Sequence, residues 1–252
     1  MNSNEDLTRF ARLGFEDFRR LAADASLSAY EKIGFPNSYR EGKEPQIFAD
    51  ILAKLERLGD AGSTVLDIGP GCSDVPKMLI AHCRRLGQEL HLVDSAEMLD
   101  QLEDAEGVHK HAAFYPECPE LLERLRGRVD AVIVYSVLHY IYVDTNLFKF
   151  VDVTLSLLAP GGALLIGDIP NVSMRKRFFS SDTGKAFHRA FTGTDTDPEV
   201  AHHQIEHGQI DDAVVFGIMQ RARAAGFHAY ALPQPPQLPL ANRREDILII
   251  RP

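Results

Sequence analysis

The sequence predicts an α/β protein with a seven-stranded, mostly parallel sheet and helices on both faces. Short β-branched and apolar runs alternate with helical segments through the middle of the chain. The first run, Thr64 to Ile68, leads into a turn with two glycines one residue apart. Two short apolar runs, 227–232 and 246–251, end the chain, and we expect them to form an antiparallel pair at one edge of the sheet.

Composition restricts the classes of function. The 252 residues are 45% hydrophobic and 25% charged, as in a soluble globular protein of one domain, with or without a cap. The net charge of -9 opposes binding to nucleic acid or to an anionic membrane. Three cysteines without CxxC spacing disfavour a disulfide framework and a cysteine zinc site. No apolar stretch is typical of a signal peptide or a membrane span, so we expect a cytoplasmic protein.

An N-terminal helical cap is predicted ahead of the main domain. Residues 5–30 are polar, with apolar residues at helical intervals: Phe10, Leu13, Phe18 and Leu21. A second helix, about 45–58, leads to the first strand. We therefore expect a helical cap over residues 1–44 and a main domain over residues 45–252.

The main domain alternates between strands and helices, which predicts parallel strand pairing. The predicted strands before the final pair are 65–68, 89–93, 108–113, 130–135 and 163–167. The predicted helices are 75–86, 96–102, 120–126, 147–158 and 211–225. Residues 159–162 read as a turn. Residues 170–209 interrupt this alternation. We expect this insertion to form a lid or a wall of the substrate site, because long insertions after the carboxyl end of a strand are usually functional.

Four motifs follow the predicted strands in order. Asp67-x-Gly69-x-Gly71 follows the first strand, and an acid, Asp94, ends the second. The run 135–140, Tyr-Ser-Val-Leu-His-Tyr, follows the fourth strand, and 158–162, Leu-Ala-Pro-Gly-Gly, precedes the fifth. Ligands of open α/β sheets bind at the carboxyl ends of the strands, so these motifs predict a ligand site.

Together these motifs resemble the class I S-adenosylmethionine-dependent methyltransferases, over about residues 45–170. The resemblance implies a Rossmann-like sheet and S-adenosyl-L-methionine as cofactor. It places the loop of Gly69, Pro70 and Gly71 under the methionine part, with Asp67 near the amino group. An acid beside an ammonium and a sulfonium is electrostatically favourable.

The resemblance also assigns the nucleoside contacts. Asp94 would accept both ribose hydroxyls, a role that suits a carboxylate. Ser95 and Met98 would flank the ribose and adenine, and Ala113 and Phe114 would meet the adenine edge. The chain departs from the family's commoner pattern here, because no aspartate directly follows the third strand.

Three further residues are predicted at the cofactor. Tyr135 and Ser136 follow the fourth strand, and Arg40 belongs to the cap. Arg40 would meet the cofactor carboxylate, because a guanidinium forks well onto a carboxylate. The alternative for Arg40 is a surface position.

Three rival functions remain open. A nicotinamide-dependent oxidoreductase would need a third glycine where Asp74 stands, and an acid there would repel a pyrophosphate. A methyltransferase that acts on a macromolecule is the second rival, but the fourth strand is not followed by the Asn-Pro-Pro-Tyr or Asp-Pro-Pro-Tyr box of base-amino methyltransferases. A catalytically silent, methyltransferase-like binding protein is the third. The intact Asp67, Gly69, Gly71 and Asp94 argue against it.

Methyl transfer to a hydroxyl requires a base as well as a positioned acceptor. His139 is the first candidate, because it follows the fourth strand and its ordinary pKa is near neutral. Asp168, at the end of the fifth strand, is the second, and His188 of the insertion is the third. The alternatives are a packed histidine for His139 and a turn cap for Asp168.

The insertion carries further histidines and basic residues. His203 and His207 have the spacing of one helical face, but neither a HExxH motif nor a third ligand accompanies them, so we expect no metal. Residues 175–177 and 243–244 are basic, which suits an anionic acceptor, or else a solvated loop. We expect a monomer or homodimer that methylates a hydroxyl or amine of a small polar metabolite, with a sugar or sugar nucleotide as one option.

Overall fold

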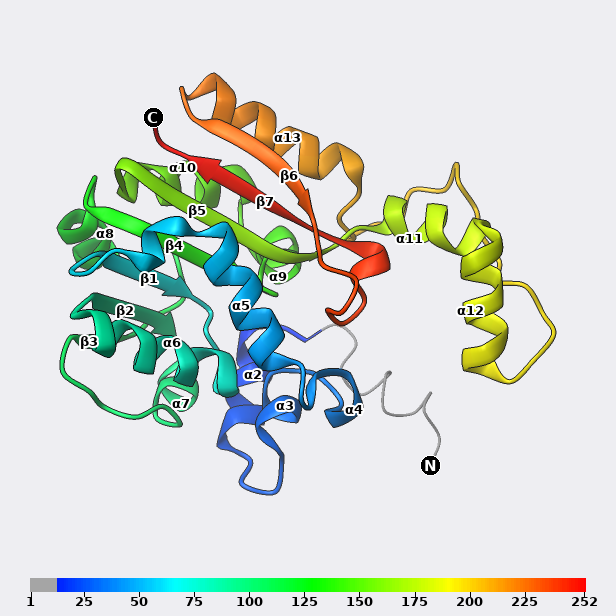
Figure 1. Cartoon of the computed structure of the whole chain (residues 1–252), viewed down its shortest axis with the longest axis horizontal. Coiled ribbons are helices and arrows are strands. Elements are labelled where there is room, and N and C mark those ends of the chain that lie inside the picture. Colours follow the sequence, from blue (N-terminus) through cyan, green and yellow to red (C-terminus); the bar gives the residue numbers. More distant parts are fainter. Residues whose placement is uncertain (1–12) are drawn as a thin grey trace.

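A seven-stranded sheet forms the centre of the molecule (Figure 1). The computed structural model describes residues 13–252, so the first twelve residues of the predicted cap lie outside the described residues. The strands are β1 (Thr64–Ile68), β2 (Glu89–Asp94), β3 (Val108–Ala112), β4 (Val129–Tyr135), β5 (Leu158–Pro170), β6 (His228–Pro233) and β7 (Arg244–Ile250). Their order in space is β3-β2-β1-β4-β5-β7-β6.

The pairing of the strands confirms the predicted fold class. Strands β1 to β5 pair in parallel, whereas β7 is antiparallel to both β5 and β6. The chain runs outward from β1 to β3 and then returns to the other side of β1 with β4. The carboxyl ends of β1 and β4 therefore flank the switch point, where open α/β sheets bind their ligands.

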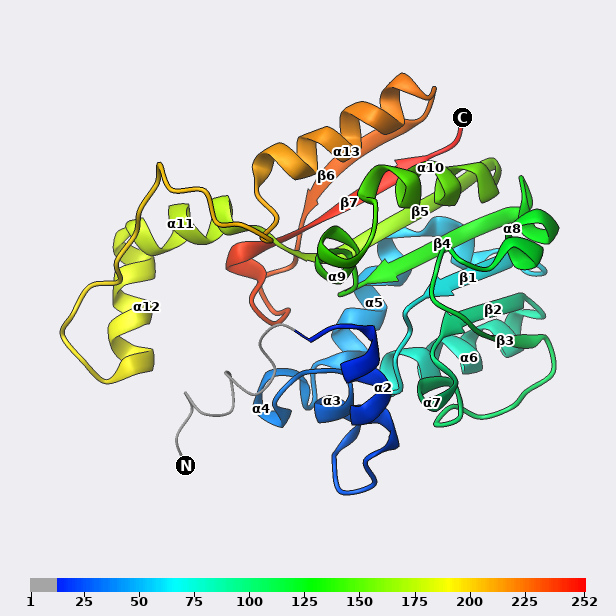
Figure 2. The ribbon, with the colours of Figure 1, turned by 180° about the vertical axis from the view of Figure 1, so that it is seen from behind.

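Helices cover both faces of the sheet (Figures 1 and 2). The N-terminal helices are α2 (Phe15–Ala23), α3 (Ala29–Lys32), α4 (Asn37–Arg40), α5 (Glu44–Lys54) and the 3₁₀ turn η1 (Glu56–Gly59). The middle of the chain adds α6 (Asp74–Leu86), α7 (Ala96–Leu99), α8 (Pro119–Leu125), α9 (Leu138–Asp144) and α10 (Leu147–Leu157). The last elements are α11 (Val172–Ser180), α12 (Asp182–Thr192), α13 (Asp212–Ala224) and η2 (Ala241–Arg243).

Two apolar clusters, one on each face, hold these helices to the sheet. Alternate residues of a strand point to opposite faces. Accordingly, Leu66 and Ile68 of β1 pack with α8, α10 and α13, whereas Val65 packs with α5 and α6. The strands thus carry apolar side chains on both faces, as a sheet covered on both sides requires.

The predicted turn at 159–162 is a bulge inside a longer strand. Leu158 pairs with Val129, and Ala163 pairs with Ala131. The four residues of β5 between these pairs therefore lie opposite a single residue of β4 and outside the ladder of paired residues. A Cβ on Gly162 would lie 2.7 Å from the Val129 carbonyl oxygen, so only glycine fits. The prediction of a separate turn was wrong because the chain resumes the same strand after the bulge.

The cap is broken into short helices, so the single amphipathic helix predicted over 5–30 is wrong within the described part. Helix α2 ends at Ala23, and Ser28 caps α3 by accepting a hydrogen bond from the Glu31 amide at 3.2 Å. Serine followed three residues later by glutamate is a helix-start signal that interrupts the longer periodic pattern. Helix α9, over 138–144, was not predicted.

Helices α11 and α12, residues 172–192, form an arm that extends from the end of β5 away from the sheet (Figure 1, right). A Cβ on Gly184 would lie 1.9 Å from the Phe178 carbonyl oxygen, so glycine allows the two helices to pack closely. The two ends of the insertion meet, because the Val172 amide donates to the Ile210 carbonyl at 2.8 Å.

Residues 201–210 form no helix, so the helical face predicted for His203 and His207 is wrong. Within residues 13–252, no helix has the length and apolar character needed to cross a membrane.

A buried ion cluster joins α5 to β7. The Lys54 ammonium lies 2.6 Å from carboxylate oxygens of both Asp50 and Asp246. Asp246 is fully buried, and it also accepts hydrogen bonds from the Asp168 amide at 2.8 Å and the Gln234 side chain at 3.0 Å. The cluster therefore fixes the end of β5, where the predicted site begins.

We expect Lys54→Met to lower the free energy of unfolding by about 3–5 kcal/mol, because it leaves two buried carboxylates without their cation. The control is Lys77→Met, which removes a pair with Asp74 whose side chains are 48% and 56% exposed. Such exposed pairs contribute at most about 1 kcal/mol. Urea unfolding of both variants measures the difference, and equal losses would contradict a supporting role for Lys54.

Candidate functional site

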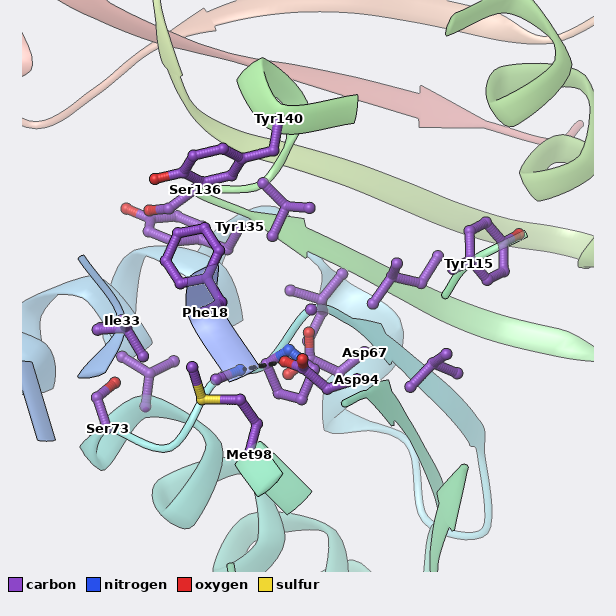
Figure 3. A pocket seen from close by; sticks show the side chains of 18 of the residues that line it. Phe18, Ile33, Asp67, Ser73, Asp94, Met98, Tyr115, Tyr135, Ser136 and Tyr140 are labelled. Atoms are coloured by element: carbon purple, nitrogen blue, oxygen red, sulfur yellow. Dashed lines mark hydrogen bonds between the residues drawn. The ribbon is translucent and has the colours of Figure 1, made fainter. Parts of the chain in front are cut away.

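A deep pocket opens at the carboxyl ends of β1, β2 and β4, under the N-terminal helices (Figure 3). It spans about 1180 Å³ of space, open solvent at its mouth included. The glycine loop after β1 and the residues after β2 and β4 line its floor and wall, and α2 and α9 line its mouth. The pocket lies at the switch point of the sheet.

The glycine loop has a backbone that only glycine adopts readily. Gly69 and Gly71 have φ of 70° and 64°. A Cβ on Gly69 would lie 2.7 Å from Val137, and one on Gly71 would lie 2.6 Å from Ile33. The Gly71 amide donates to the Asp94 carboxylate at 3.0 Å. The two glycines thus let the loop pass between the start of α9, the end of α3 and the end of β2.

Two carboxyl groups lie together on the floor of the pocket (Figure 3). Burial raises the pKa of Asp67 to about 8, and the neighbouring Asp94 raises it further. Burial also raises the pKa of Asp94 to about 6, although the amides of Gly71 and Ser95 oppose the shift. Among the described residues, no cation pairs with either carboxyl group. The floor therefore favours a ligand with a positive charge or hydroxyl donors.

Helix α2 covers the pocket through two aromatic contacts. Phe15 meets the ring of Phe114 edge-on at 5.0 Å, and Phe18 meets Tyr140 of α9 at 4.8 Å. An ion pair of 2.7 Å between Arg19 and Glu97 ties α2 to α7. These contacts close the pocket on the side away from the sheet.

A buried polar cluster stands at the end of the pocket near β5. The Asp168 carboxylate accepts hydrogen bonds from Ser136, from Arg40 at 3.3 Å and from Arg244 at 2.6 Å. Ser136 and Asp168 have φ of 61° and 58°, a left-handed conformation that is uncommon outside glycine. Backbone strain of this kind gathers at functional sites.

Most predicted cofactor residues line the pocket together. These are Asp67, Gly69, Pro70, Gly71, Asp94, Met98, Ala113, Phe114, Tyr135, Ser136 and Arg40. Ser95 is the exception, because its hydroxyl accepts the Met98 amide at 3.3 Å and caps α7. The structure thus gathers residues from five separate segments of the sequence.

The structure does not bring the predicted bases into the pocket. His139 lies behind the lining, where burial and the cations Arg244 and Arg40 lower its pKa to about 3. A group with this pKa is a weak proton acceptor at neutral pH. Asp168 is held by two guanidinium groups and lies outside the main pocket.

His188 lies farther away, on α12, in a separate hollow with Arg175 and Glu206. Within residues 13–252, no three His, Cys, Asp or Glu side chains are placed to hold a metal ion.

Part of the aromatic lining was not predicted. Phe15 and Phe35 line the pocket without having been singled out, whereas Phe18 belonged to the helical pattern of the cap and Tyr140 to the motif after the fourth strand. Glu44 was also missed. Its carboxylate accepts the Asp74 amide at 2.5 Å and so caps the N-terminus of α6, next to the glycine loop. Long-range contacts of this kind leave no local pattern in a sequence.

Comparison with known proteins identifies the fold. No family model matches the chain, and no curated protein matches it. Among solved structures, it is similar to the plantazolicin methyltransferase BamL in complex with a triazolic desmethylPZN analog and SAH. The TM-score is 0.57 at 13% identity, with 99% of each chain covered.

Two other solved methyltransferase structures are similar to the chain over most of its length. The N-methyltransferase NodS from Bradyrhizobium japonicum WM9, in complex with S-adenosyl-L-homocysteine, gives a TM-score of 0.53 at 16% identity, covering 94% of this chain and 97% of that one. A SAM-dependent methyltransferase from Aquifex aeolicus gives 0.52 at 13% identity, covering 88% and 97%. The chain therefore has the class I methyltransferase fold, as the motifs indicated.

The raised pKa of Asp67 makes a prediction about stability. Because its pKa is about 8 in the folded protein and about 3.9 in an unfolded chain, folding favours the protonated form. That stabilisation is complete below about pH 4 and is lost as the pH rises through about 8. We expect Asp67→Asn to be more stable than the wild type at pH 8.5, by on the order of a few kcal/mol. The difference in the free energy of unfolding should be smaller at pH 5.

Urea unfolding at the two pH values measures this difference. Asp60→Asn, at an exposed position, is the control and should follow the wild type. A difference between Asp67→Asn and wild type that does not change with pH would contradict the buried, protonated state of Asp67.

Proposed function

We propose that this chain is an S-adenosylmethionine-dependent methyltransferase. The observation that carries the proposal is the pair of uncompensated carboxyl groups, Asp67 and Asp94, beside the glycine loop at the switch point. A cofactor with ribose hydroxyls, an ammonium and a sulfonium complements this floor. The fold, which is that of class I methyltransferases, supports the same assignment.

The pocket residues suit the parts of this cofactor. Asp94 would accept the ribose hydroxyls, and Asp67 would pair with the ammonium. Met98 and Phe114 would enclose the adenine. Arg40 bonds to Ser136 and Asp168 through Nη2 alone, so its other N–H groups are open to the cofactor carboxylate. When bound, the cofactor supplies the methyl group.

A nicotinamide dinucleotide fits the same pocket poorly. Its pyrophosphate would need the free amides at the N-terminus of α6. Glu44 already accepts the Asp74 amide there, and the Asp74 side chain adds a second negative charge. Two carboxylates at this helix end repel a diphosphate.

We propose a small molecule as acceptor, methylated on a hydroxyl or an amine. Helix α2 covers the pocket, and the aromatic rings of Phe18, Phe35, Tyr135 and Tyr140 line it. An apolar lining of this kind suits in-line transfer to a positioned acceptor, because it can exclude water once both ligands are bound. We assign no base, because His139 lies outside the lining. The three free cysteines suit the reducing cytoplasm.

Asp94→Asn should weaken the binding of S-adenosylhomocysteine by about 10- to 100-fold, since it removes a charged acceptor worth about 1.5–3 kcal/mol. Isothermal titration calorimetry measures the affinity, and Asp100→Asn is the control at an exposed position. Unchanged affinity in Asp94→Asn would refute the cofactor site. Stabilisation by NADH instead of S-adenosylhomocysteine would favour the oxidoreductase.

The affinity for S-adenosylhomocysteine should also depend on pH. Asp67 must lose its proton to pair with the ligand ammonium, and its pKa is about 8 in the free protein. Affinity should therefore rise between pH 6 and pH 7.5, by up to about tenfold per pH unit. In Asp67→Asn the dependence should be much weaker. A wild-type affinity that falls over this range would contradict the pairing.

An assay of methyl transfer distinguishes an enzyme from a catalytically silent binding protein. Incubation with methyl-labelled S-adenosylmethionine and a small-molecule extract should label an acceptor in the wild type and not in Asp94→Asn. Binding without transfer across such extracts would favour the silent protein.

A further inference from the structure

Tyr140, in helix α9, lines the pocket with a hydroxyl group that has no hydrogen-bond partner among the described residues. Four other described residues line the pocket with hydroxyl groups, and each of them has a partner: Ser73 with Glu44, Tyr115 with Thr154, Tyr135 with Gln234, and Ser136 with Asp168. Polar groups that are withdrawn from bulk water normally have a partner. Within the described lining, the Tyr140 hydroxyl is therefore the one that a ligand can engage without breaking a bond inside the protein.

Tyr140 lies at the end of the pocket near β5. Figure 3 shows it apart from the two carboxyl groups of the floor, Asp67 and Asp94. The charged groups that act on its hydroxyl are instead Arg40 and the other members of the buried polar cluster around Asp168. Arg40 is our proposed partner of the cofactor carboxylate, so Tyr140 lies toward the methionine part of a bound cofactor. The methyl group is carried there, and the acceptor has to approach it there.

The lining around Tyr140 is apolar. Phe18 meets the Tyr140 ring edge-on, with the ring centres 4.8 Å apart. Val137 and Ile141, at the start of α9 and in it, also line the pocket, and Phe35 adds another ring. A flat ring packs well against aromatic side chains. A sugar fits such a lining poorly, because each of its hydroxyl groups that faces an apolar side chain loses a hydrogen bond to water.

The charged groups at this end of the pocket already have partners. The Asp168 carboxylate pairs with Arg244 at 2.6 Å and with Arg40 at 3.3 Å. The remaining N–H groups of Arg40 are those proposed for the cofactor carboxylate. The reacting group of the acceptor therefore needs to bring no charge to this end, and a neutral hydroxyl or amino group suits it.

We propose that the methyl acceptor is a phenol or an aromatic amine, and that the Tyr140 hydroxyl binds its O–H or N–H group. The proposal rests on the proposed function, since it names the acceptor class of the same pocket. The shared chemistry is a flat ring that carries a protic oxygen or nitrogen. By accepting a hydrogen bond from that O–H or N–H, the Tyr140 oxygen would orient the acceptor atom, with a lone pair toward the methyl group.

Tyr140 orients the acceptor and is not a base. Burial raises the pKa of Tyr140 to about 12, so its hydroxyl stays neutral at physiological pH. In the transfer, the lone pair of the acceptor atom forms the new bond to the methyl carbon. The electrons of the broken carbon–sulfur bond remain on sulfur, which leaves a neutral thioether, and the proton of the acceptor passes to water.

The test uses the full-length protein with saturating S-adenosylhomocysteine, so that small probes reach only the rest of the pocket. Phenol and aniline are the two probes. Toluene has the same shape without a protic group, and glucose represents a sugar. Tyr140→Phe removes only the hydroxyl. Tyr142→Phe is the matched control, because Tyr142 belongs to the same helix and does not line the pocket.

NMR titration measures the affinities. We expect phenol or aniline to bind the wild type and Tyr142→Phe alike, and more tightly than toluene. Tyr140→Phe should bind the stronger probe about three- to tenfold more weakly, as for the loss of one hydrogen bond, and toluene as before. The stronger probe identifies the acceptor as a phenol or an aromatic amine.

Three results would overturn the proposal. They are a failure of both probes to bind, equal probe affinity in the wild type and Tyr140→Phe, and tighter binding of glucose than of either probe.

The affinity for S-adenosylhomocysteine, measured in parallel, keeps the two ideas apart. It should be the same in Tyr140→Phe and the wild type, and a loss confined to Tyr140→Phe would mark Tyr140 as a cofactor contact and overturn the acceptor assignment. If the protein binds no S-adenosylhomocysteine, the same titrations are made without it. Probe binding that depends on Tyr140 would then refute the proposed function alone. Cofactor binding without a preference for the protic probes would refute the acceptor class alone.

Discussion

The Asp168 carboxylate is the interaction on which the rest of the site depends. It joins Arg40 of the cap, Ser136 after β4 and Arg244 of β7 to the end of β5. Because a buried carboxylate requires such partners, the four elements cannot separate without leaving charges unpaired. The cap, the pocket wall and the end of the pocket near β5 are therefore held in one arrangement by a single group. The backbone amide of Asp168 is in turn held by Asp246.

Much of this arrangement could be predicted from the sequence because it is local or periodic. The strand pattern, the glycine loop and the acid that ends β2 predicted the sheet and the floor of the pocket. The contacts of the α11–α12 arm could not be predicted in the same way. Arg243 and Phe179 are far apart in sequence, and only the course of the arm brings them together. His139 followed the right strand, but a turn of helix α9 places it behind the lining.

The ligand-free pocket holds two acids without cations on its floor, Asp67 and Asp94. Burial raises the pKa of both carboxyl groups, so the empty floor disfavours their charged forms. A ligand with a positive charge or with hydroxyl donors would relieve this cost. The electrostatics of the floor can thus select the kind of ligand that binds there.

The hydrogen bond between Val172 and Ile210 has a consequence for how this fold can diversify. Since both ends of the insertion meet at one point, the chain leaves the end of β5 and returns beside it before α13 begins. The entropic cost of closing a loop grows slowly with its length, so the length of this segment can vary with little effect on strand register. The arm can therefore differ between proteins of this fold while the sheet stays the same.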